Sequence, residues 1–136
     1  MEKPPFVSFI VCSYQGEHLI GRLLDSIFSQ DYAPNKFEAI VVDGGSKDRT
    51  LDILEKYPVI LIHNAKQYPE GPGFGKAQGI DKAKGELLVI VDQDNELQGK
   101  NWLRSMVNLF LHEPEAFGSW CRMQIRTTDP LINRYL

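Results

Sequence analysis

The segment that most constrains the fold is an unbroken apolar run at residues 87–91, which is followed at once by Asp92 and Asp94. A run of this kind predicts a strand that is buried on both faces, as the strands of parallel sheets are. In open α/β sheets the ligand crevice lies outside the carboxyl ends of the strands. Two carboxylates at that place suit a hard divalent cation bound through oxygen, which would bridge the phosphates of a nucleotide. The alternative is a solvated turn after a core strand, because Asp and Asn are ordinary turn residues.

Three further segments of mostly apolar residues predict the other strands of the same sheet. They are residues 6–12, 37–42 and 59–62. Between the first two, apolar residues recur at helical spacing over residues 19–28, which predicts an amphipathic helix. Ser46 is expected to cap a second helix that runs through Tyr57, with Asp48 in its first turn.

The second half of the chain continues this alternation. Residues 64–75 contain two prolines and three glycines and are expected to form a loop, which leads into a helix over residues 76–84 and then into the strand that ends at Asp92. A helix over residues 102–112 and a strand over residues 118–125 are expected to follow. The resulting order, β-α-β-α-β-loop-α-β, predicts an α/β fold, a three-layer α/β/α sandwich with a mostly parallel central sheet.

Composition places the chain among single globular domains. Its 136 residues are 43% hydrophobic, which suffices for one core, and its net charge of −3 gives no electrostatic footprint for nucleic acid. Cys12 and Cys121 lie in apolar surroundings without metal-ligand spacing, so we expect two buried free thiols in a reducing, cytoplasmic compartment. The polar, proline-containing start is unlike a signal peptide, and no apolar run approaches the roughly 18 residues that span a bilayer.

Two further loops carry candidate ligand groups. Asp43 follows a predicted strand and precedes two glycines, so its carboxylate is expected to accept hydrogen bonds from a base that the glycines allow to approach closely. The alternative there is a tight turn with a capping serine. The glycine-rich segment 71–79 can present N–H groups to phosphate. It is neither a dinucleotide fingerprint nor a P-loop, because the G-x-G-x-x-G register is absent and Lys76 is not followed by Ser or Thr.

Taken together and in this order, the motifs closely resemble the family 2 glycosyltransferases of the GT-A fold. The resemblance covers residues 6 to about 110. The segments that carry it are the strand ending in Cys12-Ser13-Tyr14, then Asp43-Gly-Gly-Ser-Lys-Asp-Arg-Thr50, then Gly71-Pro-Gly-Phe-Gly-Lys-Ala-Gln-Gly79, and finally Gly85-Glu-Leu-Leu-Val-Ile-Val-Asp92-Gln-Asp94. The resemblance implies an enzyme that moves a sugar from a nucleotide diphosphate sugar to an acceptor, with Mg2+ or Mn2+ as cofactor.

The resemblance also implies roles for individual residues. Asp94 would be the principal metal ligand, and Asp92 would meet the ribose or the metal. The remaining implied contacts are to the nucleotide: Ser13 and Tyr14 would line the pocket for base and ribose, Asp43 would hydrogen-bond the base, and Glu17, Gly73 and Lys76 would lie near the nucleotide and its diphosphate.

The sequence departs from the family pattern in three places. Gly44 stands where many members carry a second Asp, and Gln78 replaces the Asn that usually ends the glycine-rich motif, without the preceding Arg. No general-base motif follows the metal motif, since the acids well downstream of it are Glu113, Glu115 and Asp129 alone. We therefore expect one nucleotide-sugar-binding domain, residues 1–136, cut short at its C-terminus. The missing part would supply the base, the acceptor site and any association with the cytoplasmic face of a membrane.

Two alternatives stay open beside a glycosyltransferase of cell envelope polysaccharide synthesis with a saccharide or lipid-linked acceptor. One is a non-catalytic nucleotide-sugar-binding domain, because no base motif is visible. The other is a sugar-phosphate nucleotidyltransferase on a related fold. That class would place a glycine-rich loop bearing Arg and Lys directly after the first strand, where this chain has Ser13-Tyr14-Gln15-Gly16-Glu17.

Overall fold

The computed structural model describes residues 4–64, 67–113 and 115–121, and within these the core is a parallel sheet. Its strand order is β3-β2-β1-β4. The strands are β1 (Val7–Ser13), β2 (Phe37–Asp43), β3 (Ile60–His63) and β4 (Leu87–Asp92). Each of the four strands predicted from apolar runs up to Asp92 is therefore present within about a residue of its expected bounds, and the α/β class is confirmed.

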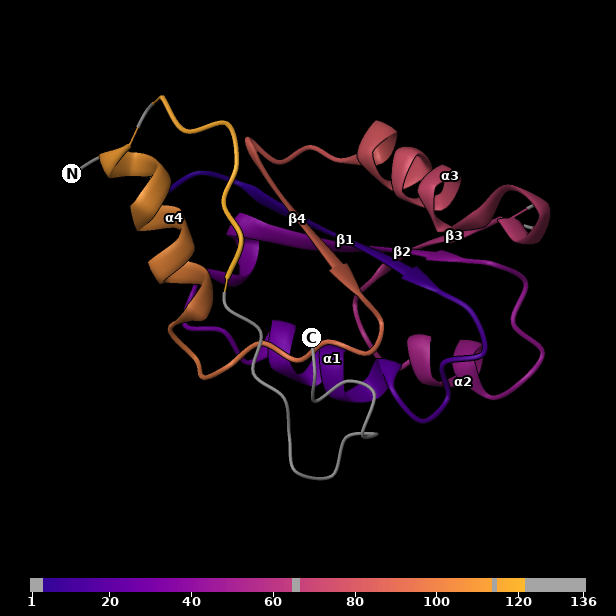
Figure 1. Ribbon diagram of the computed structural model, residues 1–136. Helices are drawn as coiled ribbons and strands as arrows, with labels where there is room; N and C mark the ends of the chain where they lie inside the picture. Colours follow the sequence, from indigo (N-terminus) through magenta and orange to yellow (C-terminus); the bar gives the residue numbers. More distant parts are fainter. Residues whose placement is uncertain (1–3, 65–66, 114, 122–136) are drawn as a thin grey trace, which may run out of the picture.

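Helices cover both faces of this sheet, as Figure 1 shows. On one face α1 (Ile20–Phe28), α2 (Thr50–Leu54) and α4 (Trp102–His112) pack over a buried cluster that includes Phe9 and Val11 of β1. On the other face α3 (Gln67–Lys82) lies across β1 and β2, above a smaller cluster that contains Ile10. A short 3-10 turn, η1 (Pro34–Lys36), leads into β2. Every residue of β1 is buried, as a central strand between two helical layers requires.

The glycine-rich segment is helical, so the prediction of a loop over residues 64–75 is wrong for the part from Gln67 onward. α3 contains one non-helical residue, Gly71, with φ of 72° and ψ of 177°. Pro72 follows it at the start of the second helical segment. A glycine adopts the positive φ without a steric penalty, and a proline is tolerated in a first helical turn because its missing N–H has no helical partner there.

The prediction that β4 is buried on both faces is also wrong. Leu88 and Ile90, which share one face of the strand, are 43% and 49% exposed. β4 stands at an edge of the described sheet, and α3 packs on β1 and β2 rather than over β4. The face toward α1 and α4 is the buried one, since Val91 belongs to the larger core cluster.

One helix start and one strand also differ from expectation. α2 begins only at Thr50, its N-cap is Arg49 without a side-chain hydrogen bond, and Asp48 precedes the helix. Ser46 therefore does not cap it. No strand forms over 118–121, and the rest of the strand expected at residues 118–125 lies outside the described residues.

The two cysteines are both free, but only one of them is buried. Cys12 is enclosed in the sheet, whereas Cys121 is exposed, so the expectation of two buried thiols is half wrong. Across the described ranges, every helix falls short of the length and hydropathy that a membrane-spanning helix requires.

Candidate functional site

A cavity of about 620 Å³ opens at the carboxyl ends of β1 and β4. Its lining comes from three segments that are far apart in sequence: the end of β1, the kink in α3 and the turn after β4. The lining residues are Cys12, Ser13, Tyr14, Leu19, Gly71, Pro72, Asp92, Gln93 and Asp94. This volume lies within the range of small-molecule pockets, about 300–1,000 Å³, and the position is where ligands bind in open α/β sheets.

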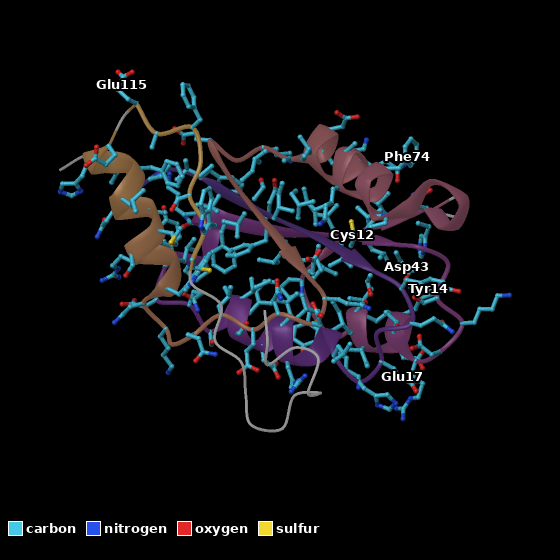
Figure 2. The ribbon with its side chains drawn as sticks, in the orientation of Figure 1. Cys12, Tyr14, Glu17, Asp43, Phe74 and Glu115 are labelled. Atoms are coloured by element: carbon cyan, nitrogen blue, oxygen red, sulfur yellow. The ribbon has the colours of Figure 1, made fainter. Side chains whose placement is uncertain are left out.

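The parallel register explains why these segments meet. Ser13 lies beside Asp43 of β2, and Cys12 lies beside Asp92 of β4. Because all three strands run in the same direction, the polar residues that follow them emerge at one edge of the sheet. Figure 2 shows Cys12, Tyr14 and Asp43 gathered at that end of the molecule, near the bend that leads into α3.

The two carboxylates lie on a tight turn at the cavity wall. The backbone N–H of Asn95 donates to the carbonyl oxygen of Asp92 over 3.0 Å, and the Asn95 side-chain oxygen accepts from the Asp92 N–H over 3.1 Å. The side chain of Asp92 is 63% exposed, and Asp94 is exposed as well. The turn therefore presents both carboxylates to solvent at the mouth of the cavity.

Lys76 of α3 reaches this pair. Its Nζ lies 2.9 Å from Oδ1 of Asp92, and its side chain is about one-third exposed. α3 thus brings a cation to Asp92. The contact of Lys76 with a diphosphate, which the resemblance implied, stays a prediction. An ion pair this exposed contributes little to stability, so its geometry matters more for the charge of the site than for folding.

The donor set suits a metal that is bound together with a substrate. No group of three or more His, Cys, Asp or Glu side chains within the described residues could hold a metal by itself. Mg2+ is commonly held by one or two carboxylates while substrate phosphates and water complete its six oxygen ligands. Asp92 and Asp94 supply such a pair of oxygen donors on the cavity wall.

Asp43 has a different setting from the one expected. Its side chain is 1% exposed and does not line the cavity. Oδ2 accepts hydrogen bonds from the backbone N–H groups of Gly45 and Ser46, each over 2.9 Å, and Oδ1 accepts from the Ser46 hydroxyl. Gly45 adopts a φ of 86° in this turn. The carboxylate therefore holds the β2–α2 turn in place, and its contact with a base stays a prediction.

Glu17 and Gly73 do not reach the cavity either. Glu17 Oε2 accepts from the N–H of Arg49, and the N–H of Glu17 donates to Asp48 Oδ2, so these contacts join the loops that precede α1 and α2. Gly73 is exposed near the start of the second segment of α3. The structure thus brings Ser13, Tyr14, Asp92 and Asp94 together at one cavity with Lys76 beside them, and it leaves Asp43, Glu17 and Gly73 outside its lining.

Two lining residues carry polar groups that sequence reasoning missed. Cys12 Sγ lies 3.5 Å from the carbonyl oxygen of Pro72, and burial raises the pKa of its thiol, so it stays protonated at neutral pH. Gln93 contacts Ser13 and Tyr14 through its side-chain amide. The hydrophobic periodicity of the sequence indicates a functional role for neither residue. The one available signal was the position of Gln93 between the two acids of the motif.

Comparison with known proteins places the chain in a family. The sequence profile described as Glycosyl transferase family 2 matches residues 8–132. The poly(ribitol-phosphate) beta-N-acetylglucosaminyltransferase TarS of Staphylococcus aureus is 38% identical over 91 residues, which are 65% of this chain and 16% of that protein. The chain thus spans about a sixth of the length of that relative.

Solved structures agree with the sequence comparison. The crystal structure of S. aureus TarS 1–349 in complex with UDP-GlcNAc superposes with a TM-score of 0.71 at 33% identity, covering 79% of this chain and 31% of that one. The mannosyltransferase PcManGT from Pyrobaculum calidifontis, in complex with GDP-Man and Mn2+, gives 0.73 at 30% identity, covering 79% and 33%. The expected GT-A fold is confirmed, and the chain belongs to glycosyl transferase family 2.

Proposed function

We propose that this chain binds the nucleoside diphosphate part of a sugar donor, and that the full protein transfers the sugar to an acceptor. The observation that carries the proposal is the cavity at the carboxyl ends of β1 and β4, whose wall holds both Asp92 and Asp94. Support comes from the two solved relatives above, since one is a complex with UDP-GlcNAc and the other is a complex with GDP-Man and Mn2+.

Each side of the cavity has a chemistry that fits one part of such a donor. Ser13 and Tyr14 supply a hydroxyl and an aromatic ring, which suit a ribose and a base. Asp92 and Asp94 would hold Mg2+ or Mn2+, which when bound offsets the negative charge that develops on a leaving diphosphate. Lys76, beside Asp92, would add a second positive charge near the phosphates.

The acceptor side is not assigned. In the described part of the chain, the acids that line the cavity are Asp92 and Asp94 only. Glu115 lies at the opposite end of the molecule from Tyr14 and Asp43 in Figure 2, which argues against it as the base that deprotonates an acceptor hydroxyl. We propose that the base and the acceptor site belong to other parts of the full protein. The acceptor would be a saccharide or a lipid-linked molecule of cell envelope synthesis; the name of TarS gives poly(ribitol-phosphate) for that protein.

A thermal unfolding screen tests this proposal. The ligands are UDP, UDP-GlcNAc, GDP and GDP-mannose, each with Mn2+ and with EDTA, and Mn2+ alone is the reference. A ligand present at about 100 times its Kd stabilises the folded state by about 2.7 kcal/mol, which raises the midpoint by several degrees for a chain of this size. We expect one nucleotide series to raise the midpoint in Mn2+ and to lose most of that effect in EDTA. No shift with any nucleotide in either condition would contradict the proposal.

A further inference from the structure

We propose that Gln93 is a positioning residue for donor binding, which fixes the base-side wall of the cavity relative to the carboxylate pair. The inference rests on the proposed function, since it concerns how that donor is held. Gln93 lies between Asp92 and Asp94 in sequence, and its side chain is half-buried at the cavity wall.

The amide of Gln93 makes three contacts with the end of β1. Its Oε1 accepts hydrogen bonds from the Ser13 hydroxyl and from the Tyr14 N–H, each over 3.0 Å. Its Nε2 donates to the carbonyl oxygen of Tyr14, also over 3.0 Å. Both backbone groups of Tyr14 are thus bound by one side chain that stands 79 positions away in sequence.

These contacts continue the sheet where its own ladder stops. The register of β1 and β4 ends at the pair Cys12 and Asp92. Gln93 is the residue after Asp92. Its side chain hydrogen-bonds the backbone of Tyr14 through one donor and one acceptor, as a neighbouring strand would. A side-chain amide carries a donor and an acceptor on adjacent atoms, whereas a carboxylate lacks the donor and an aliphatic chain lacks both.

Gly16 gives a second, independent sign that the position of this amide is constrained. A Cβ at Gly16 would lie 2.4 Å from Oε1 of Gln93 and 3.1 Å from its Cδ. The carbonyl oxygen of Gly16 accepts from the N–H groups of Leu19 and Ile20, which fixes it at the entry to α1. The amide therefore fits between Tyr14 and a glycine that has no side chain to displace it.

The consequence for binding follows from where the two carboxylates stand. Asp92 and Asp94 are the chain neighbours of Gln93, so movement of its side chain away from Tyr14 would let the acid pair move relative to the base-side wall. A ligand that contacts both the base-side wall and a metal at the carboxylate pair binds more tightly when their spacing is fixed, because less of the site must become ordered on binding. A ligand that contacts only one of the two gains little affinity from the fixed spacing.

The test uses the nucleoside diphosphate that the thermal screen selects, UDP or GDP. Titration calorimetry compares its binding with Mn2+ and with EDTA, for the unchanged chain and for Gln93→Leu. Gln98→Leu is the matched control, because Gln98 is exposed in the same loop and lies outside the cavity lining. In the unchanged chain we expect Mn2+ to tighten nucleotide binding about 5- to 150-fold, the usual range of coupling between sites. In Gln93→Leu we expect most of that tightening to be lost, so that the factor falls toward one, while the Kd in EDTA changes less than about threefold.

Gly16→Ala tests the same contact from the other side, and thermal unfolding confirms that each variant is folded. Gly16→Ala should reduce the factor by which Mn2+ tightens nucleotide binding, as Gln93→Leu does. The double variant Gly16→Ala with Gln93→Ala should show a factor no smaller than that of Gly16→Ala alone. If Gln93→Leu leaves the factor unchanged, or weakens binding equally with Mn2+ and EDTA, the positioning role is refuted while donor binding stands. If the unchanged chain binds neither UDP nor GDP in Mn2+, the proposed function fails and this inference falls with it.

Discussion

Asp43 illustrates how a single side chain can serve the fold at the place where a ligand is expected. Its carboxylate is buried and accepts hydrogen bonds from two backbone N–H groups and the Ser46 hydroxyl. These contacts close the turn that leads from β2 toward α2. Replacing the carboxylate therefore removes the support of a turn as well as any contact with a base.

We predict that Asp43→Ala lowers the free energy of unfolding by about 1–3 kcal/mol, the usual cost of leaving buried hydrogen-bonding groups unpaired. Nucleotide binding should weaken by about 1–3 kcal/mol if the carboxylate also contacts the base. Urea unfolding measures the first effect and calorimetry the second. Asp81→Ala, at an exposed position on α3, is the control. A variant as stable as the control would show that the turn does not depend on Asp43.

Asp48 gives the loops before α1 and α2 a dependence on pH. Partial burial raises its pKa, but hydrogen bonds from the Thr50 hydroxyl and from backbone N–H groups, those of Glu17 and Thr50 among them, outweigh this, so the pKa lies below its ordinary value. A lowered pKa contributes stability above the unfolded-state value, about 3.9 for Asp, and that stability is lost as the pH falls through the folded-state value.

The free energy of unfolding should therefore drop more steeply below about pH 4 in the unchanged chain than in Asp48→Asn. Urea unfolding between neutral and acidic pH, with Asp81→Asn as a reference for an exposed carboxylate, measures the difference. Parallel pH profiles for the unchanged chain and Asp48→Asn would refute the assignment.

At the scale of elements, strands were easier to predict than helices. The runs that became β1 and β2 are apolar throughout, except Ser8 and Glu38, so no other element suits them. α3 could not be predicted from its beginning, because local propensity disfavours a helix with three glycines and two prolines near its start. Packing overrides that preference: Gly75 and Gly79 are buried, which lets the helix lie close to the sheet.

Gly79→Ala tests this close approach. A Cβ at Gly79 would lie 2.5 Å from Cγ2 of Ile10 in β1, so the helix or the side chain must shift. We predict a loss of about 1–3 kcal/mol in the free energy of unfolding, the usual cost of overpacking a core. Gly73→Ala is the matched control on the same helix, since a Cβ there meets nothing within 4 Å. Equal stabilities of the two variants would show that α3 tolerates a wider spacing from β1.

The candidate site was predictable only in part, for a similar reason. Asp92 and Asp94 follow from the rule that parallel strands present their carboxyl ends at one edge, whereas Ser13 and Tyr14 were implied by the family resemblance. The side-chain bond between Gln93 and Tyr14 depends on how two loops meet, and no local pattern encodes it. The burial of Asp43 depends likewise on the turn that folds back over it.

At the scale of the whole molecule, the cavity is assembled from segments that are far apart in sequence and that the sheet brings together. One face of β4 is open, with Leu88 and Ile90 exposed, and Phe117 and Trp120 are exposed as well. Relatives in the family are much longer than this chain. The described residues therefore form the cavity that we propose for the donor, and nucleotide binding is the part of the proposed function that can be measured on this chain.

Titration of the nucleoside diphosphate that the thermal screen selects, UDP or GDP, in the presence of Mn2+ tests the central claim most directly when the unchanged chain is compared with Asp94→Asn. Asp94 is exposed at the mouth of the cavity, so the substitution should leave the unfolding midpoint nearly unchanged. We predict that Asp94→Asn lowers the affinity in Mn2+ to the level that both proteins show in EDTA. Equal affinities of the two proteins for that nucleotide in Mn2+ would contradict the account, because the carboxylate pair would then have no part in metal-dependent donor binding.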